Sequence, residues 1–559
     1  MGEGRSGKRW IVREGPPGEA ARLATVLGVH PVAAQVFAAR GVNEGFFQSG
    51  ASDLHDPASL LGLDRALQRL ESARAGKESI RLVTDYDVDG TTSCLILHAA
   101  LDRLGGAAVS YHIPDRFTEG YGLSQRAVEK AAADGVNLLV TADIGVRDHA
   151  TVALARSLGM DVIVVDHHLP AGESVPRDAV AVLCPPQVGC AYPNKSLAAC
   201  GVSLKLASAL LVNDPRRAEI LDSMLKLAAI GTVADVVDLA NAENRAIVTL
   251  GLQGLNRGGH SPGLTALLSV AGAEIGGITA ETLGWRLGPR INAAGRLADA
   301  NAVVRLLRER DPNAALAQAS LLDELNRERQ DIQERLVETA LLCVPDPLPP
   351  FVVVAGPEAD GYHRGVVGIV AAKVRDRVNR PVAIVSIVGE LASGSVRSLP
   401  GVHATRALDS VSRYLHRHGG HAAAAGFTIS ASDLPAFTEA LCAFVVEEAG
   451  TDALVGEALI DAVVDPAQVD LRLIADLARL EPTGKGNESA CLLVRGVPAD
   501  VVVMKERHLR FRVGSLRCIW WGAADRREWL QGATEVLGRL SSNSFNGRTN
   551  PQLTVEDVR

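Results

Sequence analysis

Short apolar segments alternate with amphipathic stretches from about residue 78 to residue 232. Segments 80–84, 137–141 and 161–165 are rich in Val, Leu and Ile and have the length of strands. The stretches 92–104, 149–158 and 221–232 are predicted helices from their apolar spacing. Strands that alternate with helices in this way are typical of an α/β fold with a parallel sheet.

The pattern changes after about residue 300. Stretch 314–342 is highly charged but keeps Leu325, Ile332 and Leu336 on one face, which predicts a long helix that connects two domains. Four prolines between residues 345 and 350 end this helix. A second α/β region is predicted from 351 to about 448, and the β-rich segments of the last hundred residues, with their Gly and Asn turns, predict a small β-barrel.

Composition narrows the class of protein. At 559 residues the chain is too long for one core, and its apolar runs fall far short of the roughly 20 residues that cross a bilayer. We therefore expect no contact with a membrane. The polar first ten residues lack the apolar segment of a secretory signal. The 8 cysteines form no Cys-x-x-Cys pair, which fits a cytoplasmic protein without a disulfide framework.

Three aspartates stand at alternate positions just after the first predicted strand: Asp85, Asp87 and Asp89. Neighbouring carboxylates raise one another's pKa, and bound cations relieve the repulsion. Oxygen ligands of this kind suit Mg²⁺ or Mn²⁺. Taken alone, the motif is better explained by an ordinary Asp-Gly turn.

Further candidate ligands follow the other predicted strands. Asp143 comes after 137–141, and Asp166-His167-His168 comes directly after 161–165. Because ligands of parallel sheets gather beyond the carboxyl ends of the strands, these groups should converge, with Asp235 as a fourth contribution. Mixed carboxylate and imidazole ligation is compatible with two divalent ions, which suit displacement at phosphorus without a covalent nucleophile.

These residues, in this order, resemble the DHH phosphoesterase superfamily, named for the Asp-His-His found here at 166–168. Residues 288–296 (GPRINAAGR) are similar to a segment typical of the RecJ family. Residues 361–368, 393–397 and 419–426 are similar to the associated DHHA1 domain, and 481–487 resemble the start of the RecJ oligonucleotide-binding (OB) barrel. The resemblance covers roughly residues 60 to 559.

The resemblance implies a 5′-to-3′ exonuclease that acts on single-stranded DNA in repair and recombination, with two Mn²⁺ or Mg²⁺ ions. The metal cluster that it implies comprises Asp85, Asp87, Asp89, Asp143, His167, His168 and Asp235. All of these except Asp85 are also predicted to be catalytic. A single-strand-binding protein and a helicase are further candidate partners, which the residues themselves do not indicate.

The same resemblance implies a set of DNA-binding residues. It places Arg116, Ser395 and Arg397 around the 5′-phosphate, and Arg290, Asn292, Arg296 and His421 along the strand. In the basic stretch 505–517, strand alternation puts Arg510 and Arg512 on one face, where they suit an oligonucleotide groove. Trp520 and Trp521 are adjacent, so at most one of them is a stacking candidate.

The implied domains are an N-terminal segment (1–60), a DHH catalytic domain (61–255), a linker region with the long helix (256–345), a DHHA1 domain (346–450) and an OB-fold domain (451–559). The chain has Thr483 where Phe is common in the family, and Val396 where Gly is usual in what we expect to be a turn that presents Arg397.

Three other interpretations stay open at this point. The segment Asp87-Val-Asp89-Gly-Thr-Thr also resembles the nucleophile loop of haloacid-dehalogenase-type phosphatases, which have no use for the Asp-His-His motif. A DHH enzyme for short oligonucleotides would need the same metal centre without the barrel. An inactive DHH scaffold would be expected to lack metal ligands, whereas this chain keeps them.

Overall fold

The computed structural model describes residues 3–170, 172, 174–448, 455–545 and 547–559. The chain forms two compact units, each built from segments that are distant in sequence. The parallel-sheet unit comprises 45–327 and 480–488, and the two-sheet unit comprises 1–44, 328–479 and 489–559. Within the described ranges, no helix has both the length and the apolar character needed to cross a membrane.

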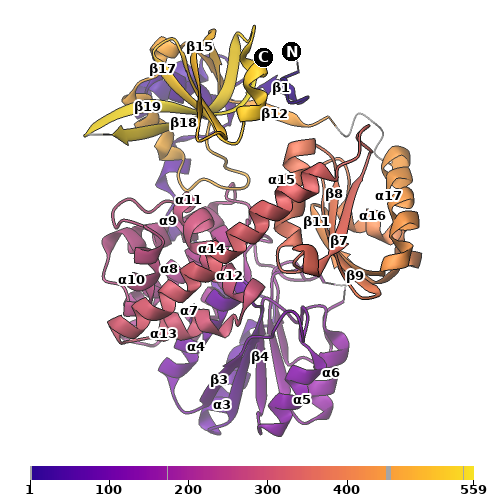
Figure 1. Ribbon diagram of the computed structural model, residues 1–559. Coiled ribbons are helices and arrows are strands. Elements are labelled where there is room, and N and C mark those ends of the chain that lie inside the picture. Colours follow the sequence, from indigo (N-terminus) through magenta and orange to yellow (C-terminus); the bar gives the residue numbers. More distant parts are fainter. Residues whose placement is uncertain (1–2, 171, 173, 449–454, 546) are drawn as a thin grey trace. The chain divides into compact units, whose positions relative to one another are not determined.

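The parallel-sheet unit contains five strands in the order β3-β2-β4-β5-β6, and every neighbouring pair is parallel (Figure 1). The strands are β2 (Ser79–Thr84), β3 (Ala108–His112), β4 (Leu138–Ala142), β5 (Asp161–Val165) and β6 (Ala181–Leu183). The three strands predicted from apolar runs are thus confirmed as β2, β4 and β5, which are neighbours in the sheet.

Alternation along these strands supplies two cores. Ile80 and Leu82 of β2 pack in one core with α3 (Leu63–Ala75), α4 (Val88–Leu104) and α7 (Ala199–Leu210), whereas Val83 packs in another with α5 (Gln125–Ala133) and α6 (His149–Ser157). Both faces of the sheet are therefore covered by helices, as a parallel sheet requires. The remaining helices of this unit are α8 (Arg217–Ala234), α9 (Ala242–Arg257), α10 (Pro262–Val270), α11 (Ala280–Thr282), α12 (Gly288–Leu297) and α13 (Asn301–Arg308).

The two-sheet unit contains a five-stranded mixed sheet in the order β10-β11-β9-β8-β7. Its strands are β7 (Val352–Pro357), β8 (Val382–Val388), β9 (Leu391–Arg397), β10 (Leu415–Gly420) and β11 (Ala424–Ser430), with α15 (Val367–Val378), α16 (Ala404–Ser410) and α17 (Leu434–Glu448). The expected turn at 393–397 is wrong, because these residues lie in β9. Val396 is buried there between strands β8 and β11, where a β-branched side chain packs well.

The second sheet of this unit has seven strands in the order β13-β14-β18-β19-β17-β16-β15. They are β13 (Ala462–Val464), β14 (Cys491–Arg495), β15 (Pro498–Met504), β16 (His508–Val513), β17 (Leu516–Trp520), β18 (Glu535–Phe545) and β19 (Arg548–Val558), with α18 (Leu471–Leu477) beside them. Strand β1 (Arg9–Val12), which α1 (Glu19–Leu27) and α2 (Pro31–Ala39) follow, pairs in parallel with β12 (Glu457–Ile460). Trp10 of β1 is buried and donates a hydrogen bond to Asp557 at 3.1 Å, so the N-terminus is part of this unit.

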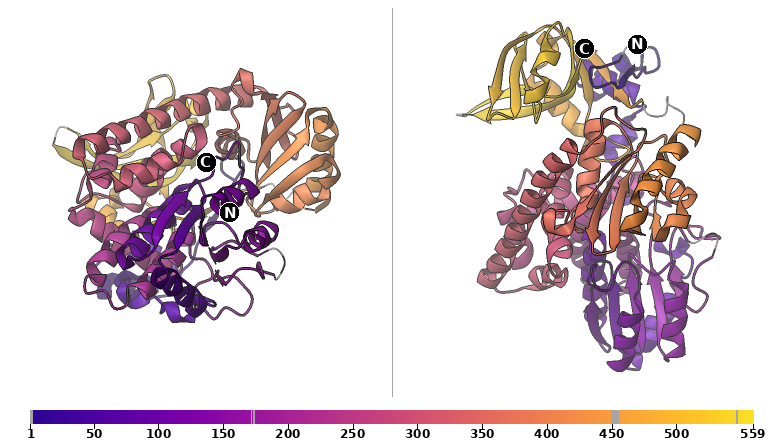
Figure 2. Two further views of the ribbon diagram at one scale, coloured as in Figure 1. Left: turned by 90° about the horizontal axis from the view of Figure 1, so that it is seen from below. Right: turned by 45° about the vertical axis from the view of Figure 1, so that its right-hand side comes forward.

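Helix α14 (Pro312–Leu342) is the long helix predicted from the charged stretch, and it is one unbroken helix in every view (Figures 1 and 2). The boundary between the two units falls inside it, after Arg327. The expectation that this helix joins two parts of the chain is therefore confirmed. The five-part division of the chain stays a prediction.

Candidate metal centre

The three alternating aspartates occupy a tight turn between β2 and α4. Helix α4 begins at Val88, four residues before the predicted start, and Asp87 is its N-cap, accepting a hydrogen bond from the Gly90 N–H at 3.0 Å. A Cβ atom on Gly90 would lie 2.3 Å from the Asp85 carbonyl oxygen, so only glycine fits this turn. The turn brings Asp85 and Asp87 beyond the end of β2 and leaves Asp89 in the first turn of α4.

Asp89 is fixed by the N-terminus of α7. Its two carboxylate oxygens accept hydrogen bonds from the N–H groups of Ala199 at 2.7 Å and Cys200 at 2.8 Å. Unpaired N–H groups at a helix N-terminus stabilise a negative charge. The buried Asp89 carboxylate is thereby held in one orientation before any ligand binds.

Asp166 organises the Asp-His-His segment. One of its oxygens accepts from the His167 N–H at 2.7 Å and faces His168 Nδ1 at 2.8 Å, and the other accepts from the Val146 N–H at 3.0 Å. These contacts use both oxygens of the buried carboxylate. Asp166 therefore positions the two histidines, and it stays outside the groups of ligand atoms that converge.

His167 is the point of convergence. Its Nε2 lies 3.2 Å from an oxygen of Asp143 and 3.8 Å from one of Asp89, and its Nδ1 lies 3.6 Å from one of Asp235. Three groups in the described residues place their ligand atoms within 4.8 Å of one another: Asp143, His167 and His168; Asp89, His167 and Asp235; and Asp85, Asp87 and Asp143. All seven residues predicted for the metal cluster are thus brought together.

The carboxylates of the centre repel one another. Burial, followed by the charges of Asp89, Asp87 and other aspartates, raises the pKa of Asp143 well above its usual value. Burial and Asp87 also raise the pKa of Asp85, and burial raises that of Asp235 to about 8 although His167 opposes the shift. For His167, burial lowers the pKa, but Asp235, Asp89 and other carboxylates outweigh it and raise the pKa overall. The centre therefore carries more negative charge than its own side chains neutralise.

Two buried atoms of the centre make no hydrogen bond within the described residues: Asp85 Oδ1, and His167 Nε2, whose neighbours are the carboxylate oxygens of Asp143 and Asp89. A buried polar atom without a partner is costly, unless a ligand supplies one. Carboxylate oxygens with an imidazole nitrogen form a donor set that suits Mn²⁺ or Mg²⁺. Asp143 also has a φ of +64°, an unusual conformation for an aspartate that places its side chain in the centre. The residues present fit two divalent ions.

Three residues beside the centre make contacts that the sequence did not predict. The hydroxyl of Tyr121 lies 3.1 Å from His168 Nε2, so this imidazole is held at both nitrogens. Arg116 was predicted for the 5′-phosphate, and its guanidinium stacks on the Tyr86 ring at 4.7 Å. Gly295 of α12 packs on the Tyr86 carbonyl, where a Cβ would lie 2.7 Å away. No sequence pattern indicates Tyr121.

The other predicted DNA contacts in this unit lie on α12. Arg296 and Asn292 are half-buried, and the charge of Arg296 acts on Tyr86, which places this side chain near the aspartate turn. Arg290 differs, because its guanidinium is already engaged by Asp323 at 2.8 Å and by the Arg286 carbonyl at 2.7 Å. Arg290 therefore fixes α12 to α14.

The Ser395 and Arg397 side chains meet at the start of α15 in the two-sheet unit. Arg397 Nη1 donates to Ser395 Oγ at 2.7 Å, and a Cβ on Gly368 would lie 2.9 Å from the Arg397 guanidinium. Burial, with the charge of Arg375, lowers the pKa of Arg397 to about 10. Within the described ranges, Arg397 forms no ion pair with a carboxylate. His421, another predicted contact, is exposed between β10 and β11.

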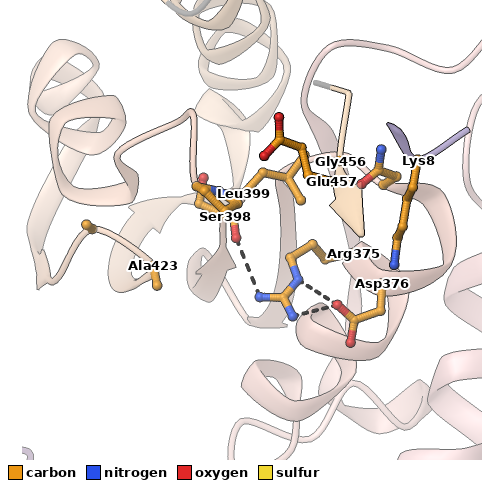
Figure 3. Close-up of a pocket in the computed structure, with 11 residues that line it drawn as sticks. Lys8, Arg375, Asp376, Ser398, Leu399, Ala423, Gly456 and Glu457 are labelled. Carbon is orange, nitrogen blue, oxygen red and sulfur yellow. Dashed lines mark hydrogen bonds and ion pairs between the residues drawn. The ribbon is translucent and has the colours of Figure 1, made fainter. Parts of the chain in front are cut away.

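A cavity of about 410 Å³ lies beside the end of β9 (Figure 3). Lys8, Arg375, Ser398 and Glu457 are among the residues that line it. The Arg375 guanidinium is already held by Asp376 at 2.5 Å and donates to the Ser398 carbonyl at 3.5 Å (Figure 3). The cavity is thus lined by charges of both signs. Arg375, which also lies near Arg397, is neutralised by Asp376.

On the seven-stranded sheet, Arg510 and Arg512 are exposed while Phe511 between them is buried, as strand alternation predicts. A cavity of about 590 Å³ is lined by both arginines together with Arg517, Asn543 and Gln552. Trp520 is buried, whereas Trp521 is 55% exposed and packs edge-to-face with His508 at 4.9 Å, so Trp521 is the member of the pair with an accessible ring.

Comparison with known proteins agrees with this arrangement. Residues 79–232 match the N-terminal domain of the DHH family, 350–447 match the DHHA1 domain, and 460–557 match the RecJ OB domain. The chain is 34% identical to the single-stranded-DNA-specific exonuclease RecJ of Bacillus subtilis over 98% of its own length and 70% of that protein. It is 36% identical to RecJ of Escherichia coli over 94% of its length and 96% of that protein.

Solved structures give the same result. The crystal structure of RecJ from Thermus thermophilus in complex with Mn²⁺ superposes with a TM-score of 0.83 at 31% identity, covering 99% of this chain and 80% of that one. A manganese-bound exonuclease RecJ superposes with a TM-score of 0.60 at 35% identity, covering 69% of this chain and 95% of that one.

A parallel sheet that ends in an Asp-His-His rim, followed by a DHHA1 domain, defines the DHH class of proteins. The near full-length identity and the additional OB domain place the chain within that class. It belongs to the RecJ family.

Proposed function

We propose that this protein is a metal-dependent exonuclease that hydrolyses single-stranded DNA. The observation that carries the proposal is the cluster of seven carboxylate and imidazole side chains at the rim of the sheet, with two buried ligand atoms that make no hydrogen bond within the described residues. Its relatives in several bacteria bear the name of single-stranded-DNA-specific exonuclease, and every ligand predicted for the cluster is present. A scaffold without activity would not need this excess of buried negative charge.

The residues of the metal centre would have different roles in hydrolysis. Bound Mn²⁺ or Mg²⁺ would activate the attacking water and stabilise charge at phosphorus. Asp143 and His167 each belong to two of the three ligand groups and would therefore set the spacing between the ions. His168 is held by Asp166 at one nitrogen and faces the Tyr121 hydroxyl at the other, which suits it to hold a proton beside the reacting phosphate.

The 5′-to-3′ polarity is proposed from the chemistry of Arg397, Ser395 and Arg116. A terminal phosphate carries one more charge than a bridging phosphate, and guanidinium groups bind phosphate oxygens in pairs. Arg397 is a partly buried cation that lacks an acidic partner among the described side chains, and the Ser395 hydroxyl lies beside it. This pair is suited to a phosphate at the end of a strand.

The interior of the strand would contact Arg296, Asn292 and His421, and the barrel groove of Arg510 and Arg512. Arg290 was predicted for the same role, and its guanidinium is already held by Asp323, which it shares with Arg327. The eight cysteines are all free, which fits a reducing compartment, and we infer a cytoplasmic location. A nuclease confined to single strands needs other proteins to expose them, so a helicase and a single-strand-binding protein are the partners that we propose.

Strands of DNA and RNA labelled at either end test the proposal. With Mn²⁺ or Mg²⁺, we expect the 5′ label to appear first, as a mononucleotide, from single-stranded DNA and much more slowly from RNA or duplex DNA. Release of the 3′ label first would overturn the polarity. Cleavage confined to oligonucleotides of a few nucleotides would favour the alternative DHH enzyme, and a stable covalent phosphoenzyme would favour the haloacid-dehalogenase reading.

A further inference from the structure

A nine-residue loop from the C-terminal part of the chain, 480–488, belongs to the parallel-sheet unit. The Leu239 N–H donates to the Lys485 carbonyl at 2.8 Å, and Gly484 and Asn487 exchange backbone hydrogen bonds that close a tight turn. Asn487 is buried and donates to the carbonyl groups of Leu480 and Pro482. These contacts fix the backbone of Lys485 against Leu239, which follows the metal ligand Asp235 by four residues.

Gly486 packs closely against the Asp238 side chain. A Cβ there would lie 1.9 Å from a carboxylate oxygen of Asp238, and the φ of +77° also favours glycine. The loop is therefore docked in one arrangement, and the turn presents Lys485 at its tip. The Lys485 side chain is exposed and forms no ion pair within the described part of the chain.

The charges around the metal centre indicate a role for Lys485. Five carboxylates outnumber the four positive charges of two divalent ions, so the loaded centre does not attract a phosphodiester by charge alone. Cations beside the centre must supply that attraction. Arg116 stacks on Tyr86, next to Asp85, and the Lys485 backbone is hydrogen-bonded to Leu239, four residues after Asp235. The positive charge of each opposes the rise in the pKa of the nearby aspartate.

We propose that Lys485 binds a backbone phosphate of the DNA strand on the Asp235 side of the metal centre. It is a positioning residue, which holds the strand and takes no part in bond cleavage. The proposal rests on the proposed function, because it takes single-stranded DNA as the substrate. It also assigns a role to loop 480–488 that the barrel itself does not have: the loop completes the substrate site of the parallel-sheet unit.

The test compares K485A, K485E and K485R with K130A. Lys130 is a matched control, because it is an exposed lysine of the same unit whose charge is paired with Asp134 at 3.4 Å. We expect K485A to raise the KM for single-stranded DNA by about three- to tenfold with little change in kcat, and K485E to raise it further. K485R and K130A should stay within about twofold of the parent protein.

Salt dependence and metal dependence separate this role from others. Loss of one phosphate contact should make the plot of log affinity against log salt less steep by about 0.7, the value for single strands. The Mn²⁺ concentration for half-maximal activity should not change. An unchanged KM and salt slope in K485A, or a shift in the Mn²⁺ requirement, would overturn the proposal. Fluorescence anisotropy of labelled DNA, titrated with D143A or with D143A/K485A, measures the same contact without cleavage. The contribution of Lys485 to DNA binding can therefore be tested even if the parent protein proves not to be an exonuclease.

Discussion

The metal centre and the Arg397 site bury charge of opposite sign, and neither is neutralised by the protein. At the metal centre, five carboxylates lie in overlapping groups of ligand atoms, and burial with mutual repulsion raises the pKa of Asp85, Asp143 and Asp235. At the Arg397 site, a guanidinium is partly buried next to a hydroxyl, and burial lowers its pKa to about 10. The first site suits cations and the second suits an anion.

Arg290 is a contrasting case, a charged side chain that pairs with a carboxylate of the same unit. Its guanidinium lies within ion-pair distance of Asp323, a carboxylate that also pairs with Arg327, so Arg290 has an acidic partner inside the protein. Buried charge is normally paired, because desolvation of an isolated charge is costly. Unpaired charge of one sign therefore marks places that suit a ligand of the opposite sign, and we propose metal ions for the first site and a phosphate for the second.

Removal of a ligand from the metal centre should have the largest effect. Asp143→Asn keeps a residue that accepts the positive φ of this position but removes its charge, and His167→Ala removes the nitrogen on which the ligand groups converge. Each should lower hydrolysis of single-stranded DNA by at least about a thousandfold while circular dichroism shows an intact fold. Near-normal turnover by either variant would refute the metal assignment.

The stability of the metal-free protein should fall as pH rises. A carboxyl whose pKa is raised in the folded state stabilises the fold below its ordinary pKa and loses that contribution as pH rises through the folded value, which for Asp235 is about 8. With a chelator present, the melting temperature should therefore drop between pH 5 and pH 8 by at least about 2–4 °C, the change that about 1 kcal/mol produces. Mn²⁺ should abolish most of this drop. A melting temperature that does not change with pH in the metal-free protein would mean that the carboxylates do not repel one another.

Arg397→Ala should remove most of the preference for 5′-phosphorylated over 5′-hydroxyl strands. Loss of one charge-assisted hydrogen bond costs about ten- to a hundredfold in affinity. Arg375→Ala is the matched control, since that guanidinium is already held by Asp376. If both kinds of strand slow by the same factor, Arg397 serves the fold, and the reading of the 5′ end moves to Arg116.

The smallest effect is expected from the barrel groove. Arg510→Ala and Arg512→Ala should each weaken binding of long single strands by a few-fold at fixed salt, and should leave very short oligonucleotides unchanged. Arg507→Ala is the control, because Arg507 is already paired with Glu334. Equal losses on long and short strands would mean that this groove is structural. Point substitutions are preferable to a truncation, because β12 pairs with β1 and Trp10 is buried with residues of the C-terminal sheet.

Much of the metal centre was predictable, because its ligands follow buried strands whose apolar runs are unmistakable. Asp143 and Asp166 each stand directly after such a strand, and neighbouring parallel strands end at the same rim. The features that depend on contacts between distant segments could not be predicted. Nothing local indicates that the N-terminus of α7 holds Asp89, or that Trp10 belongs to the C-terminal sheet. The strand at Val396 was missed because a Gly-rich motif was read as a turn.

Calorimetric titration of Mn²⁺ into the metal-free protein, with DNA cleavage followed in the same samples, tests the central claim most directly. The claim is that the carboxylate and histidine cluster holds two divalent ions and that these make the protein a nuclease. We predict two ions per chain, cleavage that appears as both sites fill, and a loss of at least one site in Asp143→Asn. Full cleavage in the presence of a chelator, or stoichiometric binding that Asp143→Asn leaves unchanged, would contradict the account.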